Sequence, residues 1–234
     1  MHSVYLNHAG QTLTWLGMDN KETFDRNLQI KKDEMMSLGW TEDSVEYKFN
    51  QHGFRCDDFS DQPSIVFLGC SYTLGVGVAK SQCFSTLVAK KLNLAECNLA
   101  QGGGSADTCF RLFLDWHRKI KPTVVVMLQP LIQRIELLSH PLPKFFLPNQ
   151  FPKEHREFYR EWMMSNNAEY NRQKNTFAIA HLCHQINAQF VYLSAEELKT
   201  QHFKDVGRDL LHPGPLTHKK WAEILSVIIK PTFQ

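Results

Sequence analysis

From residue 64 onward, the chain alternates between short apolar runs and longer amphipathic segments. Ser64–Leu68 is almost entirely apolar and stops at Gly69, as expected of a strand buried on both faces of a sheet. Similar runs follow at residues 96–100, 123–128 and 189–193. Helical spacing of apolar residues occurs at 81–92, 106–120 and 216–229, the last with Trp221, Leu225 and Ile228 facing inward. This alternation predicts right-handed βαβ crossovers, and hence an α/β fold in which a mostly parallel sheet lies between two helical layers.

The first 60 residues lie outside this alternation. They predict a helix over residues 21–36 and carry large apolar side chains, among them Phe49 and Phe54, that need a partner surface. We therefore expect residues 1–60 to be an N-terminal elaboration packed on a main domain of residues 61–234.

A second region outside the alternation covers residues 130–153. After Pro130 it holds four more prolines among aromatic side chains, which is typical of a long loop inserted over a sheet edge. A long helix over residues 154–187 is expected to follow it.

The charges exclude some classes of protein. Lys and Arg number 26, Asp and Glu number 24, and the net charge of +2 is spread without a basic stripe, so nucleic acid is not an expected partner. No apolar run approaches the ~20 residues of a membrane span, and the first ten residues lack the apolar region of a secretory signal. We expect a cytoplasmic protein, and the six cysteines, which form no CxxC pair, are expected to be free buried thiols. The oligomeric state is left open.

Ser71 lies three residues beyond the end of the first apolar run. In open parallel sheets, ligands bind beyond the carboxyl ends of the strands, so a serine at this place can attack a bound carbonyl group. A serine that only caps a turn is the alternative interpretation. The motif differs from the Gly-x-Ser-x-Gly elbow of α/β-hydrolases, because Thr73 occupies the place of the last glycine.

Three glycines, at residues 102–104, follow the second run. Glycine tolerates positive φ angles and leaves backbone N–H groups accessible, and such groups can hold an oxyanion or a phosphate. No Gly-Lys-Ser/Thr follows them, so a nucleotide-binding P-loop is not expected. The third run ends at Gln129, whose side-chain amide is a further donor at the same sheet edge.

Near the C-terminus, Asp209 and His212 are three residues apart, and Pro213 favours an extended backbone at His212. A histidine held by a carboxylate is the general base of a serine nucleophile. His181 and His184 share one helix face but have no further ligands nearby in sequence, so no metal is expected.

In their order along the chain, these four blocks resemble those of the SGNH (GDSL-like) hydrolase superfamily. The resemblance implies the SGNH hydrolase fold, a flavodoxin-like three-layer α/β/α sandwich. It implies that Ser71 is the nucleophile, His212 the base and Asp209 its orienting acid. It also implies an oxyanion hole formed by the backbone N–H groups of Ser71 and Gly103, with Gly104 as the next candidate donor. Gln129 takes the place of the asparagine that the family carries at the end of its third strand, and a site with the two backbone donors alone is the alternative.

The resemblance further implies a serine ester hydrolase that needs no metal or organic cofactor. The first block departs from the family pattern, because Cys70 replaces an aspartate, and Cys70 is itself a conceivable nucleophile. The expected partner is a small-molecule or glycan ester, with a short acyl or acetyl ester on a glycan favoured because no long apolar lid occurs in the sequence. Two alternatives stay open: a non-catalytic glycan-binding or structural protein on the same scaffold, and an acyltransferase with the same triad.

Overall fold

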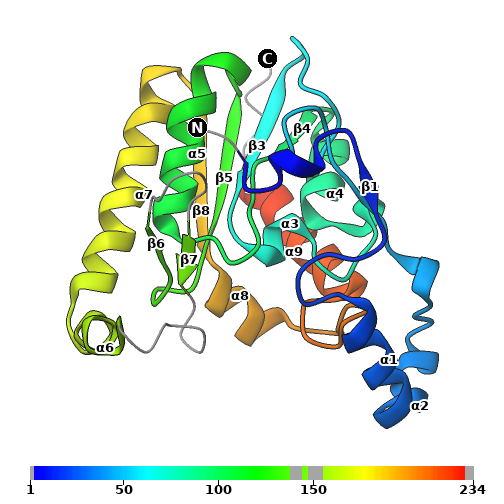
Figure 1. The fold of residues 1–234 in the computed structure, drawn as a ribbon. Helices are drawn as coiled ribbons and strands as arrows, with labels where there is room; N and C mark the ends of the chain where they lie inside the picture. The colour runs from blue at the N-terminus through cyan, green and yellow to red at the C-terminus, as the bar shows by residue number, and fades with distance from the viewer. Residues whose placement is uncertain (1–2, 138–143, 147–154, 230–234) are drawn as a thin grey trace.

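The computed structural model describes residues 3–137, 144–146 and 155–229 of the chain (Figure 1). At its centre is a four-stranded parallel sheet in the order β4-β3-β5-β8. Its strands are β3 (Ser64–Leu68), β4 (Ala95–Asn98), β5 (Val124–Gln129) and β8 (Gln189–Ser194). All four apolar runs predicted as strands are therefore confirmed, and the carboxyl ends of the strands lie along one edge of the sheet.

Helices cover both faces of this sheet (Figure 1). One face carries α5 (Ala106–Ile120) and α7 (Asn167–Gln185), and the other carries α4 (Phe84–Leu92), α8 (Ala195–His202) and α9 (Pro215–Ile228). Because successive strand residues point to opposite faces, Val66 and Leu68 pack under α5 and α7, while Ile65 and Phe67 pack under α4 and α9. The predicted three-layer α/β/α architecture is confirmed.

Two predicted helices are interrupted. The helix expected over residues 154–187 is divided into α6 (Arg156–Met164) and α7, because Ser165 takes an extended backbone conformation with φ −101° and ψ 168°. The helix expected over residues 21–36 is divided into α1 (Lys21–Ile30) and α2 (Lys32–Ser37) at Lys31.

Two details of the C-terminal third also differ from expectation. Helix α8 was not predicted. Ile228 is 40% exposed rather than inward, because α9 ends there and the following Ile229, 2% exposed, enters the core instead.

The remaining elements are short. They are η1 (Leu6–His8), β1 (Thr12–Leu13), η2 (Glu42–Ser44), β2 (Tyr47–Lys48), α3 (Ser71–Leu74), η3 (Lys80–Gln82), β6 (Ile135–Leu137) and β7 (Lys144–Phe146). Strands β6 and β7 form an antiparallel hairpin within the 130–153 insertion, in which Pro141, Pro143, Pro148 and Pro152 lie outside the described residues.

The N-terminal segment shares an apolar cluster with the α/β core. Phe24 and Phe49 belong to the same buried cluster as Leu74 and Val76, which follow strand β3. The Arg55 guanidinium is also buried, and it donates hydrogen bonds to the backbone carbonyls of residues 46, 74, 75 and 78. The segment thus contacts the loop that follows Ser71 directly.

All six cysteines are free and buried, as predicted. Within the described ranges, no helix has both the length and the apolar character needed to cross a bilayer.

Candidate active site

The blocks singled out in the sequence come from three loops of the sheet sandwich. Ser71 is the first residue of α3, directly after β3, and Gly103 lies in the loop after β4. His212 and Asp209 lie in the loop between α8 and α9. The first two loops leave the carboxyl ends of neighbouring parallel strands, which is where open α/β sheets bind ligands.

Asp209 and His212 form a hydrogen-bonded pair. Nδ1 of His212 lies 2.5 Å from Oδ2 of Asp209. The other carboxylate oxygen, Oδ1, accepts the backbone N–H groups of Leu211 and His212, each at 3.0 Å. Because one side of the imidazole is held by the carboxylate, the ring presents Nε2 on its opposite side.

The Asp209 side chain is fully buried, and only 12% of the His212 side chain is exposed. Burial acts to raise the pKa of Asp209, but the hydrogen bond and charge of His212, together with the two backbone N–H groups, lower that pKa below its usual value. Asp209 is therefore a carboxylate at neutral pH, able to stabilise an imidazolium.

One cavity brings three of the sequence-predicted residues together. It has a volume of about 430 Å³, and Ser71, Gly103 and His212 all line it. The rest of its wall is formed by Tyr5, Leu16, Gly17, Met18, Val76, Gly102 and Arg134. Asp209 lies behind the His212 ring, outside the wall.

Two backbone donors are available at this cavity. Among the described residues, no acceptor is bonded to the N–H group of Ser71 or of Gly103. Gly103 has a φ of +77°, a left-handed conformation that favours glycine. The neighbouring Gly104 is different, because its N–H group donates to Gln101 O at 3.0 Å.

Gln129 does not line this cavity. Its amide donates to Thr176 Oγ1 at 3.0 Å, and its side chain lines a separate cavity with Phe177 and Tyr192. The reason is the alternation along β5: Met127 packs on the face covered by α7, and Gln129, two residues further, points to that same face. The structure thus gives the expected oxyanion role of Gln129 no support.

The N-terminal segment fixes the loop that carries the acid and the base. The fully buried Arg208, next to Asp209, donates from Nε and Nη2 to the Asp19 carboxylate at 3.0 and 2.8 Å. Tyr47 donates its hydroxyl proton to Asp19 at 2.5 Å and accepts the N–H group of Gly77 at 2.8 Å. One buried network therefore holds the loops on both sides of the cavity.

Sequence patterns pointed to none of Tyr5, Met18, Arg134 and Asp19. Each of them reaches the site only through the folding of the chain, and no local motif marks it.

Burial raises the pKa of Tyr5 to about 12, so the phenol stays protonated at neutral pH. Its oxygen accepts the N–H group of Gly102 at 3.1 Å.

A larger cavity, of about 560 Å³, lies away from this site, between the start of β4 and η3. Asp57, Lys80 and Glu96 are among its lining residues, and none of the four sequence blocks contributes its functional side chains to the wall. No group of three or more His, Cys, Asp or Glu side chains placed to hold a metal ion occurs in the part of the chain that the structure describes.

The fold and the site together define an α/β/α protein in which a serine and the histidine of a buried aspartate–histidine pair line one cavity. Comparison with protein-family models and with curated proteins finds no match to the chain. Among solved structures the chain is similar to TesA, with a TM-score of 0.42 and 12% identity, covering 73% of this chain and 99% of that one.

Two further similar structures are esterases. One is the psychrotrophic esterase EstA from Pseudoalteromonas sp., with a TM-score of 0.37, 12% identity, and coverage of 70% of this chain and 96% of that one. The other is a family two carbohydrate esterase from Cellvibrio japonicus, with a TM-score of 0.38, 13% identity, and coverage of 79% of this chain and 69% of that one.

Proposed function

We propose that the chain is an SGNH-like serine esterase that hydrolyses a carboxylic ester through Ser71, His212 and Asp209. The observation that carries this proposal is the shared cavity: Ser71, Gly103 and His212 are far apart in sequence and line the same wall. The hydrogen bond between His212 and Asp209 adds the orienting carboxylate that a histidine base requires.

In the proposed mechanism, Ser71 Oγ attacks the ester carbonyl carbon while His212 Nε2 takes the hydroxyl proton. The carbonyl oxygen becomes an oxyanion that accepts the backbone N–H groups of Ser71 and Gly103. The tetrahedral intermediate then expels the alcohol, which receives the proton from His212, and an acyl-serine remains. Water attacks that acyl group with His212 again acting as base, which releases the acid and restores Ser71.

The proposed site has two oxyanion donors rather than three, and this difference lowers the expected rate of catalysis. A single donor is typically worth about 2.7–4 kcal/mol of transition-state stabilisation, so a site without the family's asparagine is expected to be a slower catalyst. Because Gln129 is bonded to Thr176, it leaves the oxyanion site one donor short. This shortage favours the second candidate function, a non-catalytic glycan-binding protein on this scaffold.

A short acyl group is the proposed acyl part of the substrate, with an acetyl ester on a glycan preferred. Small-molecule pockets span roughly 300–1,000 Å³, and the cavity at Ser71, about 430 Å³, lies at the lower end of that range. An acyltransferase would use the same acyl-serine with an alcohol in place of water as the second nucleophile.

The test is hydrolysis of p-nitrophenyl acetate, butyrate and octanoate by the wild type and three variants. We expect the highest kcat/KM for acetate, turnover at least about 10³-fold slower in Ser71→Ala and His212→Ala, and a large loss in Asp209→Asn, since the carboxylate orients the ring. Circular dichroism would show that each variant is folded. Turnover in Ser71→Ala equal to that of the wild type, or none above background in the wild type, would overturn the proposal.

A further inference from the structure

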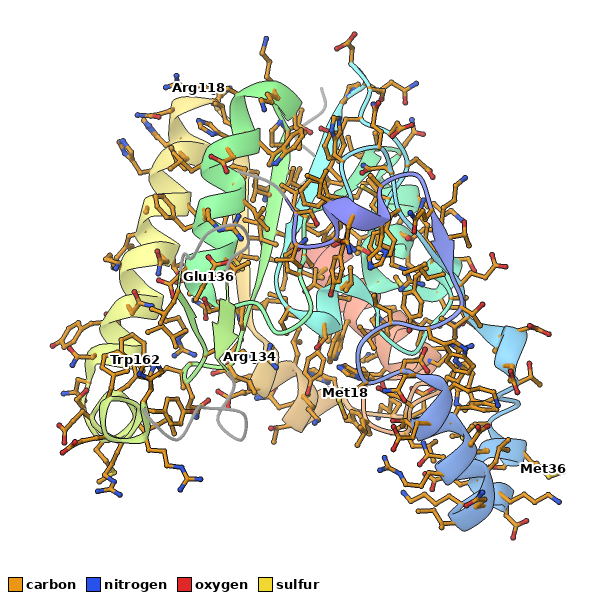
Figure 2. The ribbon with its side chains drawn as sticks, viewed as in Figure 1. Met18, Met36, Arg118, Arg134, Glu136 and Trp162 are labelled. Carbon is orange, nitrogen blue, oxygen red and sulfur yellow. The ribbon has the colours of Figure 1, made fainter. Side chains whose placement is uncertain are left out.

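We propose that Arg134 makes the Ser71 cavity selective for esters that carry an anionic group, a carboxylate in the first instance. The inference rests on the proposed esterase function and adds the chemical class of its substrate. Arg134 lies in the 130–153 insertion, just before β6, and its side chain lines the same cavity as Ser71 and His212. Figure 2 shows Arg134 and Met18, which are far apart in sequence, at the same end of the molecule.

The Arg134 guanidinium has unused donor capacity. Nη1 donates to Gly104 O at 3.4 Å, and Nε is buried without an acceptor among the described residues. A guanidinium carries five N–H donors, so most of this one is unsatisfied within the part of the chain that the structure describes.

The arginines that are buried in the core behave differently. Arg55 donates to four backbone carbonyls, Arg208 pairs with Asp19, and Arg111 pairs with Glu136 at 2.7 Å. In each of these the terminal nitrogens of the guanidinium are matched inside the protein, although Nε of Arg55, like that of Arg134, is buried without an acceptor among the described residues. Arg134 differs because a single backbone carbonyl is its acceptor, and no carboxylate lies within ion-pair distance of it in the described ranges.

The wall of the cavity supplies no counter-charge from the residues that the structure describes. Its ionisable side chains are Tyr5, His212 and Arg134, and Tyr5 stays neutral because burial raises its pKa. The carboxylate of Asp209 lies behind His212 and is already engaged with that ring and two backbone N–H groups. A partly buried cation without a partner is unfavourable, and a ligand carboxylate would relieve this with paired, charge-assisted hydrogen bonds.

The insertion holds Arg134 in place before any ligand binds. Two residues further on, Glu136 forms the buried ion pair with Arg111 of α5, and the Arg134 backbone N–H donates to Leu131 O at 3.1 Å. Because the hairpin is anchored to a core helix, the backbone that carries Arg134 is already fixed, so only side-chain freedom is lost when a ligand binds.

The anionic group can lie on the acyl side or on the alcohol side of the ester, and two matched substrate pairs separate these sources. Mono-p-nitrophenyl succinate against p-nitrophenyl pentanoate places a carboxylate on the acyl side. 4-Acetoxybenzoate against 4-acetoxybenzamide places it on the alcohol side. We expect the wild type to prefer the anionic member of one pair by about 10- to 100-fold in kcat/KM, the range for a hydrogen bond to a charged group.

The variants are Arg134→Gln and Arg134→Lys, with Arg118→Gln as the matched control. Arg118 is exposed at the end of the molecule opposite Arg134, so the control removes the same charge away from the cavity (Figure 2). We expect Arg134→Gln to abolish the preference, because kcat/KM falls at least tenfold more for the anionic ester than for the neutral one, and Arg134→Lys to keep part of it. Arg118→Gln should behave as the wild type.

Two results would overturn the inference. One is a wild type that does not prefer either anionic ester. The other is an equal loss for anionic and neutral esters in Arg134→Gln, which would assign Arg134 to the oxyanion instead. Labelling of Ser71 by a neutral phosphonate probe, run in parallel, tells the two proposals apart: absent labelling contradicts the esterase itself, and normal labelling without selectivity contradicts only the role of Arg134.

Discussion

Gly77 lies against the carboxylate of Asp209: a Cβ atom built on Gly77 would be 3.2 Å from Asp209 Oδ1. The carbonyl oxygen of Gly77 also accepts the backbone N–H group of Arg208 at 2.8 Å. The loop that follows Ser71 and the loop that carries Asp209 and His212 therefore touch through their backbones. This contact sets the position of the acid and base relative to the serine.

Replacement of Gly77 by alanine tests this contact. Gly77 has a φ of +81°, so alanine is strained there, and its methyl group would also press on the Asp209 carboxylate. Gly39→Ala is the matched control, because Gly39 has a φ of +71° with no atom within 4 Å of its Cβ position. We expect both variants to lose Tm from backbone strain, Gly77→Ala more because of the added contact, but turnover slower by tenfold or more only in Gly77→Ala. Equal turnover rates for the two variants would contradict the proposed coupling.

The buried ion pair of Asp19 and Arg208 predicts that the N-terminal segment stabilises the whole molecule. Asp19→Asn leaves Arg208 without its carboxylate in a fully buried place, and breaking such a pair typically costs about 3–5 kcal/mol. Asp25→Asn is the control, because Asp25 pairs with Lys21 at the surface with 46% of its side chain exposed, where such pairs contribute about 0–1 kcal/mol. Urea unfolding gives both values. Similar, small losses for the two variants would contradict the anchoring role.

His218 predicts a specific loss of stability in acid. Burial, then the positive charges of Arg55 and His212, lowers the pKa of His218 to about 3, and its Nδ1 accepts the Phe84 N–H group at 3.1 Å. The unfolded state binds a proton below a pKa of about 6.5, whereas the folded state does not until about pH 3. The contribution of His218 to stability is thus fully present above pH 6.5 and declines by up to ~1.4 kcal/mol per pH unit between 6.5 and 3.

Urea unfolding between pH 7 and pH 4 measures this slope. We expect His218→Gln to be less stable than the wild type at pH 7 but to lose less stability on acidification, since the titrating group is gone. His181→Gln, at an exposed position of α7, should keep the slope of the wild type. An unchanged slope in His218→Gln would show that His218 has the same pKa in the folded and the unfolded protein, which would contradict the prediction.

Much of the sheet could be predicted from the sequence because its strands carry a local signal. Val124, Val125 and Val126 are fully or almost fully buried, and a run of β-branched residues of that length fits a strand covered on both faces. The interruption between α6 and α7 was less visible. Ser165 and the two asparagines after it are the local signal for this break, and the prediction from apolar periodicity passed over them.

The candidate site was predictable only where a motif is local. Asp209 and His212 are three residues apart, and this spacing, together with its place after the other blocks, indicated a pair. Arg208 and Asp19 are 189 residues apart, and only the folded chain brings them together. For Gln129 the sequence located the end of strand β5 correctly but did not indicate the direction of the side chain. The alternation of side chains along the strand turns Gln129 toward Thr176.

Gln129→Ala is therefore expected to retain its catalytic rate. The Gln129 amide is bonded to Thr176, so its loss should change the turnover of p-nitrophenyl acetate less than twofold and lower Tm slightly. Turnover slower by 100-fold or more, with the fold intact by circular dichroism, would instead restore Gln129 as an oxyanion donor.

The most direct test of the proposed esterase is covalent labelling by an activated phosphonate ester, followed by mass spectrometry of the peptides. We expect one adduct per chain, on Ser71, at a rate that falls sharply in His212→Ala and to zero in folded Ser71→Ala. Cys70 is buried beside Ser71 and should stay unmodified in all of them. An adduct on Cys70, or labelling of Ser71→Ala at the rate of the wild type, would contradict Ser71 as the nucleophile.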